Sequence, residues 1–203
     1  MKIVECRQRS EEWFEARRGI PTTSNFDKII TSKGEPSKQR YGYLYALAAE
    51  RLTGRCEEAF QSAAMLQGIL REEEARRVYA MTKEVEVEEV GFCLSDDGRY
   101  GCSPDGFVDD LDGHGMVELK CRMGKAAVEH LLASKLSTEC IQQVQGGMMV
   151  TGTEWCDYVS YYPGLPLLIV RVTPDRSFLE KLQLELDKFC DDLDRVCDQL
   201  RGK

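Results

Sequence analysis

The chain has 203 residues, of which 42% are hydrophobic and 31% are charged. This composition is typical of a globular protein with one sizeable core, and we expect a single domain over 1–203. The formal net charge of −8 argues against indiscriminate coating of nucleic acid, although a basic pocket inside an acidic shell is compatible with it. No apolar run approaches the length of a membrane span, and the N-terminus lacks the apolar core of a secretory signal.

The nine cysteines are scattered, and none of them forms a C-x-x-C pair. This distribution is typical of reduced thiols in a cytosolic protein and argues against a disulfide framework or a structural zinc site. The sequence also contains neither a G-x-x-x-x-G-K-[ST] loop nor a G-x-G-x-x-G stretch after a strand, so nucleotide binding has no local support.

The first part of the chain, to about residue 82, is expected to be helical. Ser10 is a candidate N-cap for a short helix that stops at Gly19, and the hydroxyl-rich Thr22–Ser24 begins another helix. Apolar residues at helical spacing predict two longer helices, one ending at Gly54 and one over about 63–81.

The middle of the chain, about 83–174, is expected to hold the sheet. Period-two alternation over 84–94 is typical of a half-buried strand. Two further strands are expected near 106–109 and 116–122, joined by a turn-rich segment. The remaining elements follow in order: helices over about 125–135 and 140–150, then strands over about 155–163 and 167–174.

The last segment, about 175–201, has the pattern of a long amphipathic helix. Such a helix is expected to pack on its own sheet in preference to a partner subunit. Together with the preceding elements, this helix completes a pattern that is typical of a mixed α/β domain. Its apolar residues recur at alternating spacings of three and four: Leu179, Leu182, Leu186, Phe189, Leu193, Val196 and Leu200.

The stretch YGCSPDGFVDDLDGHGMVELKCR, from Tyr100 to Arg122, carries the chemical signal. Residues two apart in a strand point to one face, so Glu118 and Lys120 project together. If the two strands pair as a hairpin, Asp105 comes to lie beside Glu118 and Lys120. The site then offers two carboxylates, and magnesium often binds to only one or two protein carboxylates. A lone E-x-K is usually a solvated ion pair, but the combination with an upstream aspartate is more specific.

Glu72 is the second acidic candidate. It lies on a helical stripe that is otherwise small or apolar, so it needs a partner, which a metal-bound water would provide. The other members of the stripe are Met65, Gly68, Ala75 and Tyr79. Surface pairing one turn apart explains the flanking charges Glu73, Glu74, Arg76 and Arg77.

Five stretches in the same order resemble lambda exonuclease and the YqaJ-type phage recombination nucleases of the PD-(D/E)xK superfamily. They are WFEARRGIPTTS, GILREEEAR, CSPDG, ELKC and QVQGGMMVTG, and the likeness extends over most of the chain. The resemblance implies a PD-(D/E)xK nuclease core, an α/β fold with a central mixed β-sheet flanked by helices.

The resemblance also assigns catalytic roles. Asp105, Glu118 and the Leu119 carbonyl match the metal ligands, and Lys120 matches the catalytic lysine. Two further catalytic residues are carried over from the family's helices: Glu72, and Gln143, which helps hold the site together.

A DNA-end site follows from the same comparison. Arg17 and Ser24 match a pocket for the 5′-phosphate, to which Ser103 adds a hydroxyl. Met65 occupies the place of an apolar wedge that separates the terminal base pair, although helix packing explains a methionine there equally well.

The implied activity is that of an alkaline-type, magnesium-dependent and ATP-independent 5′–3′ exonuclease. It would degrade one strand of linear double-stranded DNA to mononucleotides and leave a 3′ overhang for recombination, and manganese is expected to substitute for magnesium. The implied partners are two further copies in a homotrimeric ring and a phage single-strand annealing protein. No membrane is involved, and the location is the cytoplasm of a bacterial host that carries the phage or prophage.

Two alternatives stay open at this point. One is a non-catalytic DNA-end clamp or recombination scaffold with a nuclease fold, which would have no need of the acid–acid–lysine set. The other is an iron–sulfur nuclease of the same superfamily, for which Cys190 and Cys197 lack the usual close cluster of cysteines.

Overall fold

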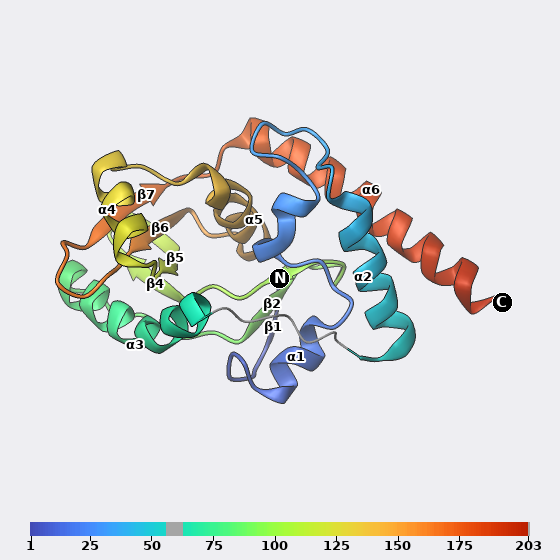
Figure 1. Ribbon diagram of the computed structural model, residues 1–203, viewed down its shortest axis with the longest axis horizontal. Coiled ribbons are helices and arrows are strands. Elements are labelled where there is room, and N and C mark those ends of the chain that lie inside the picture. Colours follow the sequence, from blue (N-terminus) through green and yellow to red (C-terminus); the bar gives the residue numbers. More distant parts are fainter. Residues whose placement is uncertain (56–62, 203) are drawn as a thin grey trace.

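A computed structural model describes residues 1–55 and 63–202, with only the backbone described for 63–65. Helices and strands alternate in a mixed α/β arrangement, coloured along the chain in Figure 1. The elements are β1 (Lys2–Val4), α1 (Glu11–Arg17), the 3₁₀ helix η1 (Thr23–Lys28), α2 (Arg40–Thr53), α3 (Ala63–Lys83), β2 (Phe92–Leu94), β3 (Gly101–Cys102), β4 (Gly106–Asp110), β5 (Gly113–Lys120), α4 (Gly124–Ala133), the 3₁₀ helix η2 (Thr138–Cys140), α5 (Ile141–Thr151), β6 (Trp155–Ser160), β7 (Leu168–Val172) and α6 (Arg176–Arg201).

The larger sheet has the strand order β4-β5-β6-β7. β4 and β5 form the expected antiparallel hairpin, β5 runs parallel to β6, and β7 is antiparallel to β6. All six residues of β6 are buried, as expected for a strand covered on both faces. The sheet is therefore mixed, as the sequence predicted.

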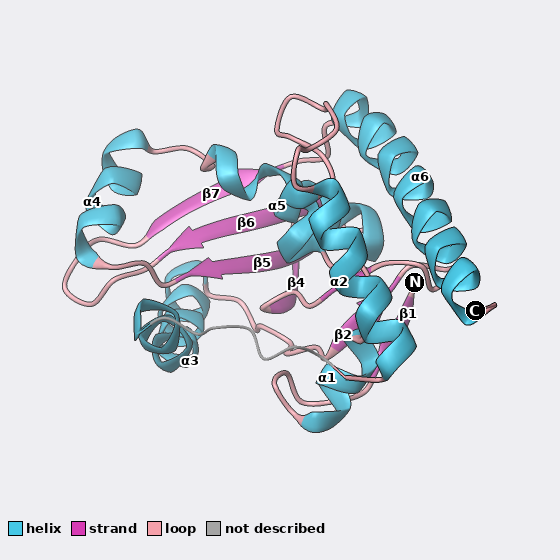
Figure 2. Ribbon diagram, turned by 45° about the vertical axis from the view of Figure 1, so that its right-hand side comes forward, coloured by secondary structure: helices cyan, strands magenta, loops and turns pink. Residues whose placement is uncertain are grey.

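Helices cover both faces of this sheet, and side chains alternate between them along β5. On one face Val117 and Leu119 join Ala75 and Tyr79 of α3 in a buried cluster. On the other face Met116 packs with apolar residues of α5. Figure 2 shows the strands lying between α3 and the helices that follow β5. Because Glu118 and Lys120 alternate with Val117 and Leu119, they face the α5 side.

The long helix α6 packs within its own chain, but not directly on the sheet as expected. Its buried face, with Leu182, Leu186 and Phe189, contacts α2 and α5. α5 already covers that face of the sheet, so α6 forms a further layer over it (Figures 1 and 2). A buried ion pair between Arg40 and Glu185, 3.0 Å apart, joins α2 to α6.

The structure corrects three expectations for the first half of the chain. The N-terminal part is not all helical, because β1 pairs with β2 in the order β1-β2-β3. The strand expected over 84–94 is reduced to β2 and one bridge between Glu88 and Phe107, since no continuous partner lies beside the rest. The helix expected after Thr22 is a single short 3₁₀ helix, η1.

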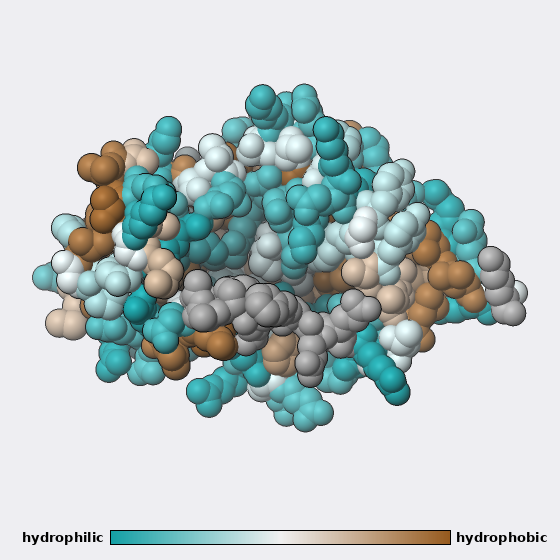
Figure 3. Space-filling model, in the orientation of Figure 1, coloured by the Kyte–Doolittle hydropathy of each residue, from teal (hydrophilic) through white to brown (hydrophobic). Residues whose placement is uncertain are grey.

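The surface of the molecule has both hydrophilic and hydrophobic areas. No helix among the described residues has the length and apolar character required to cross a bilayer. On the face in Figure 3, hydrophilic residues surround the middle, and hydrophobic residues gather toward the two ends. One of these hydrophobic areas lies over α4, where Val128 and Leu132 are exposed.

Candidate active site

The centre of the site is a closed set of hydrogen bonds on one face of β5. Lys120 Nζ donates to Glu118 Oε1 at 2.7 Å and to Gln143 Oε1 at 2.8 Å. Gln143 Nε2 donates to Glu118 Oε1 at 2.6 Å, which completes the set. The shared face of Glu118 and Lys120 is therefore present as their spacing predicted, and α5 adds Gln143 to it.

The charge on Lys120 is stabilised by its surroundings. Burial acts to lower the pKa of Lys120, but the charge and hydrogen bond of Glu118, together with the charges of Cys140 and Asp105, outweigh burial, and the pKa is raised above its ordinary value. Lys120 is therefore a cation at any physiological pH. It presents a fixed positive charge beside the buried Glu118.

Asp105 stands opposite Glu118 at the start of β4. Its backbone N–H donates to the Val117 carbonyl at 3.0 Å, and its Oδ2 accepts from the Leu119 N–H at 2.6 Å. Burial raises the pKa of Asp105 to about 8, and repulsion from Glu118 and Glu72 adds to the rise. The hairpin thus brings carboxyl groups together that hold a proton when no cation is present.

The donor set fits a magnesium ion. Asp105, Glu118 and the Leu119 carbonyl offer oxygen ligands only, which hard divalent cations prefer. The second oxygen of each carboxylate, Asp105 Oδ1 and Glu118 Oε2, takes part in none of the hydrogen bonds described above. No three His, Cys, Asp or Glu side chains in that part of the chain form a complete metal cage. A small set of ligands completed by water is the arrangement that magnesium commonly adopts.

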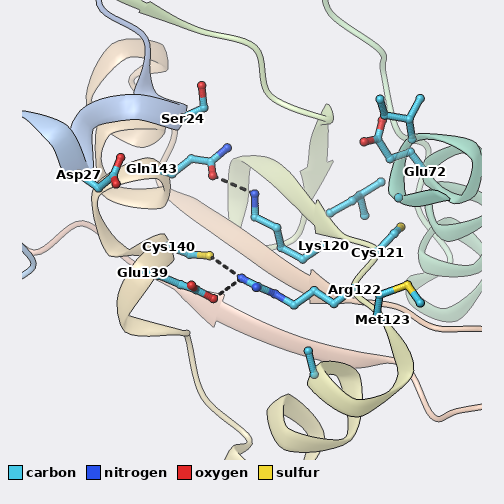
Figure 4. Close-up of a pocket in the computed structure, with 14 residues that line it drawn as sticks. Ser24, Asp27, Glu72, Lys120, Cys121, Arg122, Met123, Glu139, Cys140 and Gln143 are labelled. Atoms are coloured by element: carbon cyan, nitrogen blue, oxygen red, sulfur yellow. Dashed lines mark hydrogen bonds and ion pairs between the residues drawn. The ribbon is translucent and has the colours of Figure 1, made fainter. Parts of the chain in front are cut away.

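Glu72 reaches the same place from α3. The next residues of its stripe, Ala75 and Tyr79, are fully buried against the sheet, which turns Glu72 toward the pocket. Its Oε2 lies 2.5 Å from a guanidinium nitrogen of Arg9. In Figure 4 Glu72 projects from α3 on the wall opposite Lys120 and Gln143.

Arg17 and the hydroxyl groups of Thr22, Ser24 and Ser103 form a cluster at the other end of the pocket, the Arg17 cluster. The Arg17 guanidinium stacks 3.8 Å above the ring of Trp13, and it donates to Thr22 Oγ1 at 3.4 Å. Thr22 Oγ1 in turn lies 3.2 Å from Ser24 Oγ, and Trp13 Nε1 donates to Ser103 Oγ at 2.8 Å. A cation held between hydroxyl groups is suited to bind an oxyanion.

The predicted residues converge on one cavity of about 190 Å³. Met65 is the exception, because its side chain lies outside the described part of the chain. The residues that line the cavity, from both the catalytic and the phosphate-binding predictions, are Arg17, Ser24, Glu72, Ser103, Asp105, Glu118, Leu119, Lys120 and Gln143.

This cavity continues into a wider one of about 660 Å³, drawn in Figure 4. The two share Ser24, Glu72, Leu119, Lys120 and Gln143. Arg122, two residues beyond Lys120, lies in the wider part, where Glu139 Oε1 is 2.5 Å from its Nη2. The pocket therefore opens into a groove at the end of β5.

Among the residues at the site that the sequence analysis missed are Trp13, Thr22 and Arg76. Trp13 and Thr22 hold Arg17, and only the four-residue spacing of Trp13 and Arg17 on α1 could have indicated this. Arg76, expected to form surface pairs, instead donates from Nε to the Asp105 carbonyl at 3.0 Å. It supports the backbone that carries Asp105, a contact across 29 residues that no local pattern could reveal.

Two cysteines, Cys121 and Cys140, line the wider cavity. The eight cysteines in the described part of the chain are free thiols. Cys190 and Cys197 are buried on the core face of α6. Burial raises the pKa of Cys121, next to Lys120, to about 12, which leaves it an unreactive thiol.

Comparison with known proteins gives consistent matches. Residues 12–154 match the family model of a YqaJ-like viral recombinase domain. Two solved structures of an alkaline exonuclease, LHK-Exo from Laribacter hongkongensis, one of them in complex with dAMP, share 32% identity with the chain. Each match covers 95% of this chain and 97% of that one, with a TM-score of 0.86.

A more distant match concerns the fold alone. A phage-related exonuclease from Haemophilus somnus 129PT is 13% identical over 89% of this chain and 96% of its own, with a TM-score of 0.68. None of the curated proteins gives a significant match. The predicted nuclease fold, with a mixed sheet flanked by helices, is confirmed by these structures.

Proposed function

Since the chain belongs to the YqaJ-like viral recombinase family, we propose that it is a magnesium-dependent, ATP-independent 5′–3′ exonuclease. It degrades one strand of linear double-stranded DNA to mononucleotides and leaves a 3′ overhang for recombination. The observation that carries the proposal is the convergence of Asp105, Glu118 and Lys120 with the Arg17 cluster in one cavity. The similarity to an alkaline exonuclease supports it.

Each side chain has a task in this reaction. Asp105, Glu118 and the Leu119 carbonyl would hold the cation, which would supply Lewis-acid activation of water and charge neutralisation at the phosphate. Lys120 and Glu72 position the attacking water, and Lys120 stabilises the negative charge that develops in the transition state. Gln143 holds the Lys120 and Glu118 side chains in a fixed relative position through its two hydrogen bonds.

The Arg17 cluster gives the reaction its direction. A terminal phosphate carries more charge than an internal diester, so a cation among hydroxyl groups favours the 5′ end of a strand. The wider part of the groove, beyond Lys120, then receives the strand that remains after each cut. Each cleavage exposes a new 5′-phosphate, which the cluster draws forward.

The proposed assembly and setting follow the family. We propose a homotrimeric ring around the DNA, a phage single-strand annealing protein that receives the overhang, and action in the cytoplasm of the bacterial host. Manganese should replace magnesium, because it takes the same oxygen ligands.

The test is digestion of a linear duplex with and without magnesium, with the products separated by chain length. The expected result is release of 5′-mononucleotides from one strand at each end, only in magnesium or manganese. Lys120→Ala should abolish release while DNA binding survives, because Lys120 acts in chemistry more than in anchoring. Near-normal release by a folded Lys120→Ala protein contradicts the assignment, and wild-type binding without any release would favour the DNA-end clamp.

A further inference from the structure

Arg9 occupies a backbone conformation that an arginine rarely adopts. It lies in a turn closed by the Ser10 N–H, which donates to the Arg7 carbonyl at 3.0 Å, and its φ is +68°. This left-handed region favours glycine, and a side chain there raises the free energy of the folded state. A strained residue persists where its side chain has a use, so the contacts of Arg9 are informative.

The turn is fixed from both sides. The Gln8 amide donates to the Val90 carbonyl at 2.9 Å and to the Pro104 carbonyl at 2.7 Å, directly before Asp105. On the other side, Ser10 caps α1 by accepting from the Trp13 N–H at 3.3 Å. The turn is thus attached to the segment that carries Asp105 and to the helix that carries the phosphate cluster, and it holds Arg9 over the pocket.

The Arg9 guanidinium faces Glu72 across this pocket. The two are 63 residues apart in the chain, and Arg9 Nη2 lies 2.5 Å from Glu72 Oε2. Arg9 lines the same cavity as Asp105, Glu118 and Lys120. Its side chain remains 41% exposed, so it adds little to the core, and its contact with Glu72 is its main interaction with the site.

We propose that Arg9 is a positioning residue for Glu72. The guanidinium fixes the orientation of the Glu72 carboxylate, which reaches the pocket from α3. Without Arg9 the carboxylate can rotate toward solvent, and the attacking water loses an oriented acceptor. This inference rests on the proposed nuclease function, and it assigns to Arg9 an effect on turnover instead of DNA binding.

The first test compares Arg9→Gly with Arg9→Lys. Glycine removes the guanidinium and relieves the strained φ, so this variant should melt at or above the temperature of the wild type. Its kcat should nevertheless fall by roughly tenfold to a hundredfold, with KM for DNA little changed, because a misplaced catalytic group slows the chemical step. Lysine should restore part of the rate, since it keeps the charge but not the planar fork.

Glu84 offers a matched backbone control. It is another non-glycine residue at positive φ, +56°, directly after α3 and away from the cavity. Glu84→Gly should raise the melting temperature in the same way and leave kcat unchanged. Equal kinetics in Arg9→Gly and Glu84→Gly would overturn the proposal.

The second test is a double-mutant cycle with Glu72→Gln. If Arg9 acts through Glu72, Arg9→Gly causes no further loss of kcat in the Glu72→Gln protein. Losses that multiply would mean that Arg9 contacts the DNA itself, which overturns the positioning role. The loss should also be the same on phosphorylated and unphosphorylated 5′ ends, unlike a loss in the Arg17 cluster.

A readout without turnover separates this inference from the proposed function. Arg9→Gly removes a cation from a pocket with three carboxylates, so magnesium should stabilise it against heating at lower concentration than it stabilises the wild type. If the guanidinium acts through Glu72, the shift in magnesium dependence that Arg9→Gly causes should differ in size in the Glu72→Gln background, where the guanidinium has no carboxylate to neutralise. If the wild type degrades no linear DNA but this pattern holds, the nuclease proposal fails while the Arg9–Glu72 coupling stands. An unchanged magnesium dependence overturns the coupling.

Discussion

At the scale of single residues, Arg17 is held in place by two neighbours. Trp13 stacks on its guanidinium at 3.8 Å, and Thr22 accepts a hydrogen bond from it at 3.4 Å. A charge-assisted phosphate contact contributes about 1.5–3 kcal/mol, so Arg17→Ala should slow digestion of 5′-phosphorylated ends roughly tenfold or more. Ends that lack the phosphate should be affected much less.

The measurement is the initial digestion rate of both kinds of end by the wild type and by Arg17→Ala. Arg18→Ala is the matched control, because Arg18 is adjacent in the chain but donates from Nη1 to Glu15 at 2.7 Å. Arg18→Ala should not distinguish the two ends. An equal loss on both ends in Arg17→Ala would show that Arg17 does not read the phosphate.

Asp105 makes the stability of the metal-free protein depend on pH. Its pKa is about 8 in the folded protein, against about 3.9 in an unfolded chain. Between these values the folded protein binds a proton that the unfolded chain lacks, so the free energy of unfolding falls as pH rises from about 4 to about 8. Asp105→Asn removes this contribution, and in chelator its stability relative to wild type should rise over that interval.

Urea denaturation of both proteins at pH 6 and pH 8.5 tests this linkage. The stability difference should change in favour of Asp105→Asn by on the order of 1 kcal/mol per pH unit up to about pH 8. Saturating magnesium should reverse the order at pH 8.5, because the cation replaces the proton in the wild type only. A constant difference across pH would mean that Asp105 is ionised throughout.

At the scale of elements, local patterns together with the family resemblance predicted the residues of the cavity better than they predicted the contacts that support them. The hairpin of β4 and β5 could be read from alternation and a turn, and it alone brings Asp105 opposite Glu118. Glu72 could be read from its apolar stripe on α3. By contrast, β1 has three residues and depends on a partner 90 residues away, and Arg76 reaches Asp105 across 29 residues. Such pairings depend on the tertiary fold, which no local period encodes.

The contact between α5 and η1 shows how closely elements must approach to form the site. A Cβ added at Gly146 of α5 would lie 2.7 Å from Phe26 Cδ2 and 3.2 Å from Thr23 Cγ2 in η1. Gly146→Ala should therefore push η1 outward, destabilise the protein by about 1–3 kcal/mol and slow digestion of phosphorylated ends, since η1 carries Ser24.

Gly42 in α2 is the control for this substitution. A Cβ there would meet no atom within 4 Å, so Gly42→Ala should stabilise the protein by about 1 kcal/mol through helix propensity alone. Both variants are compared by urea denaturation and by digestion rate. If Gly146→Ala were as stable and as active as Gly42→Ala, close packing of η1 on α5 would not position the phosphate cluster.

At the scale of the whole molecule, the overall negative charge and the half-buried cations of the cavity have opposite effects on phosphate. The net charge of −8 should repel the DNA backbone in general, whereas Arg17 and Lys120, which line one cavity of about 190 Å³, should attract phosphate there. Only a strand end can enter such a pocket with its full terminal charge. We therefore expect weak binding to the interior of a duplex and a preference for ends.

A covalently closed circular duplex tests this expectation against the same sequence made linear. The circle should resist digestion in magnesium even at enzyme concentrations that consume the linear form, and a single double-strand cut should restore full sensitivity. The cavity has room for few phosphates. The affinity of the protein for the closed circular duplex should therefore fall only slightly as salt is added. Degradation of the closed circle, or a steep salt dependence on it, would show that the protein grips duplex DNA along its length and that the Arg17 cluster does not select the end.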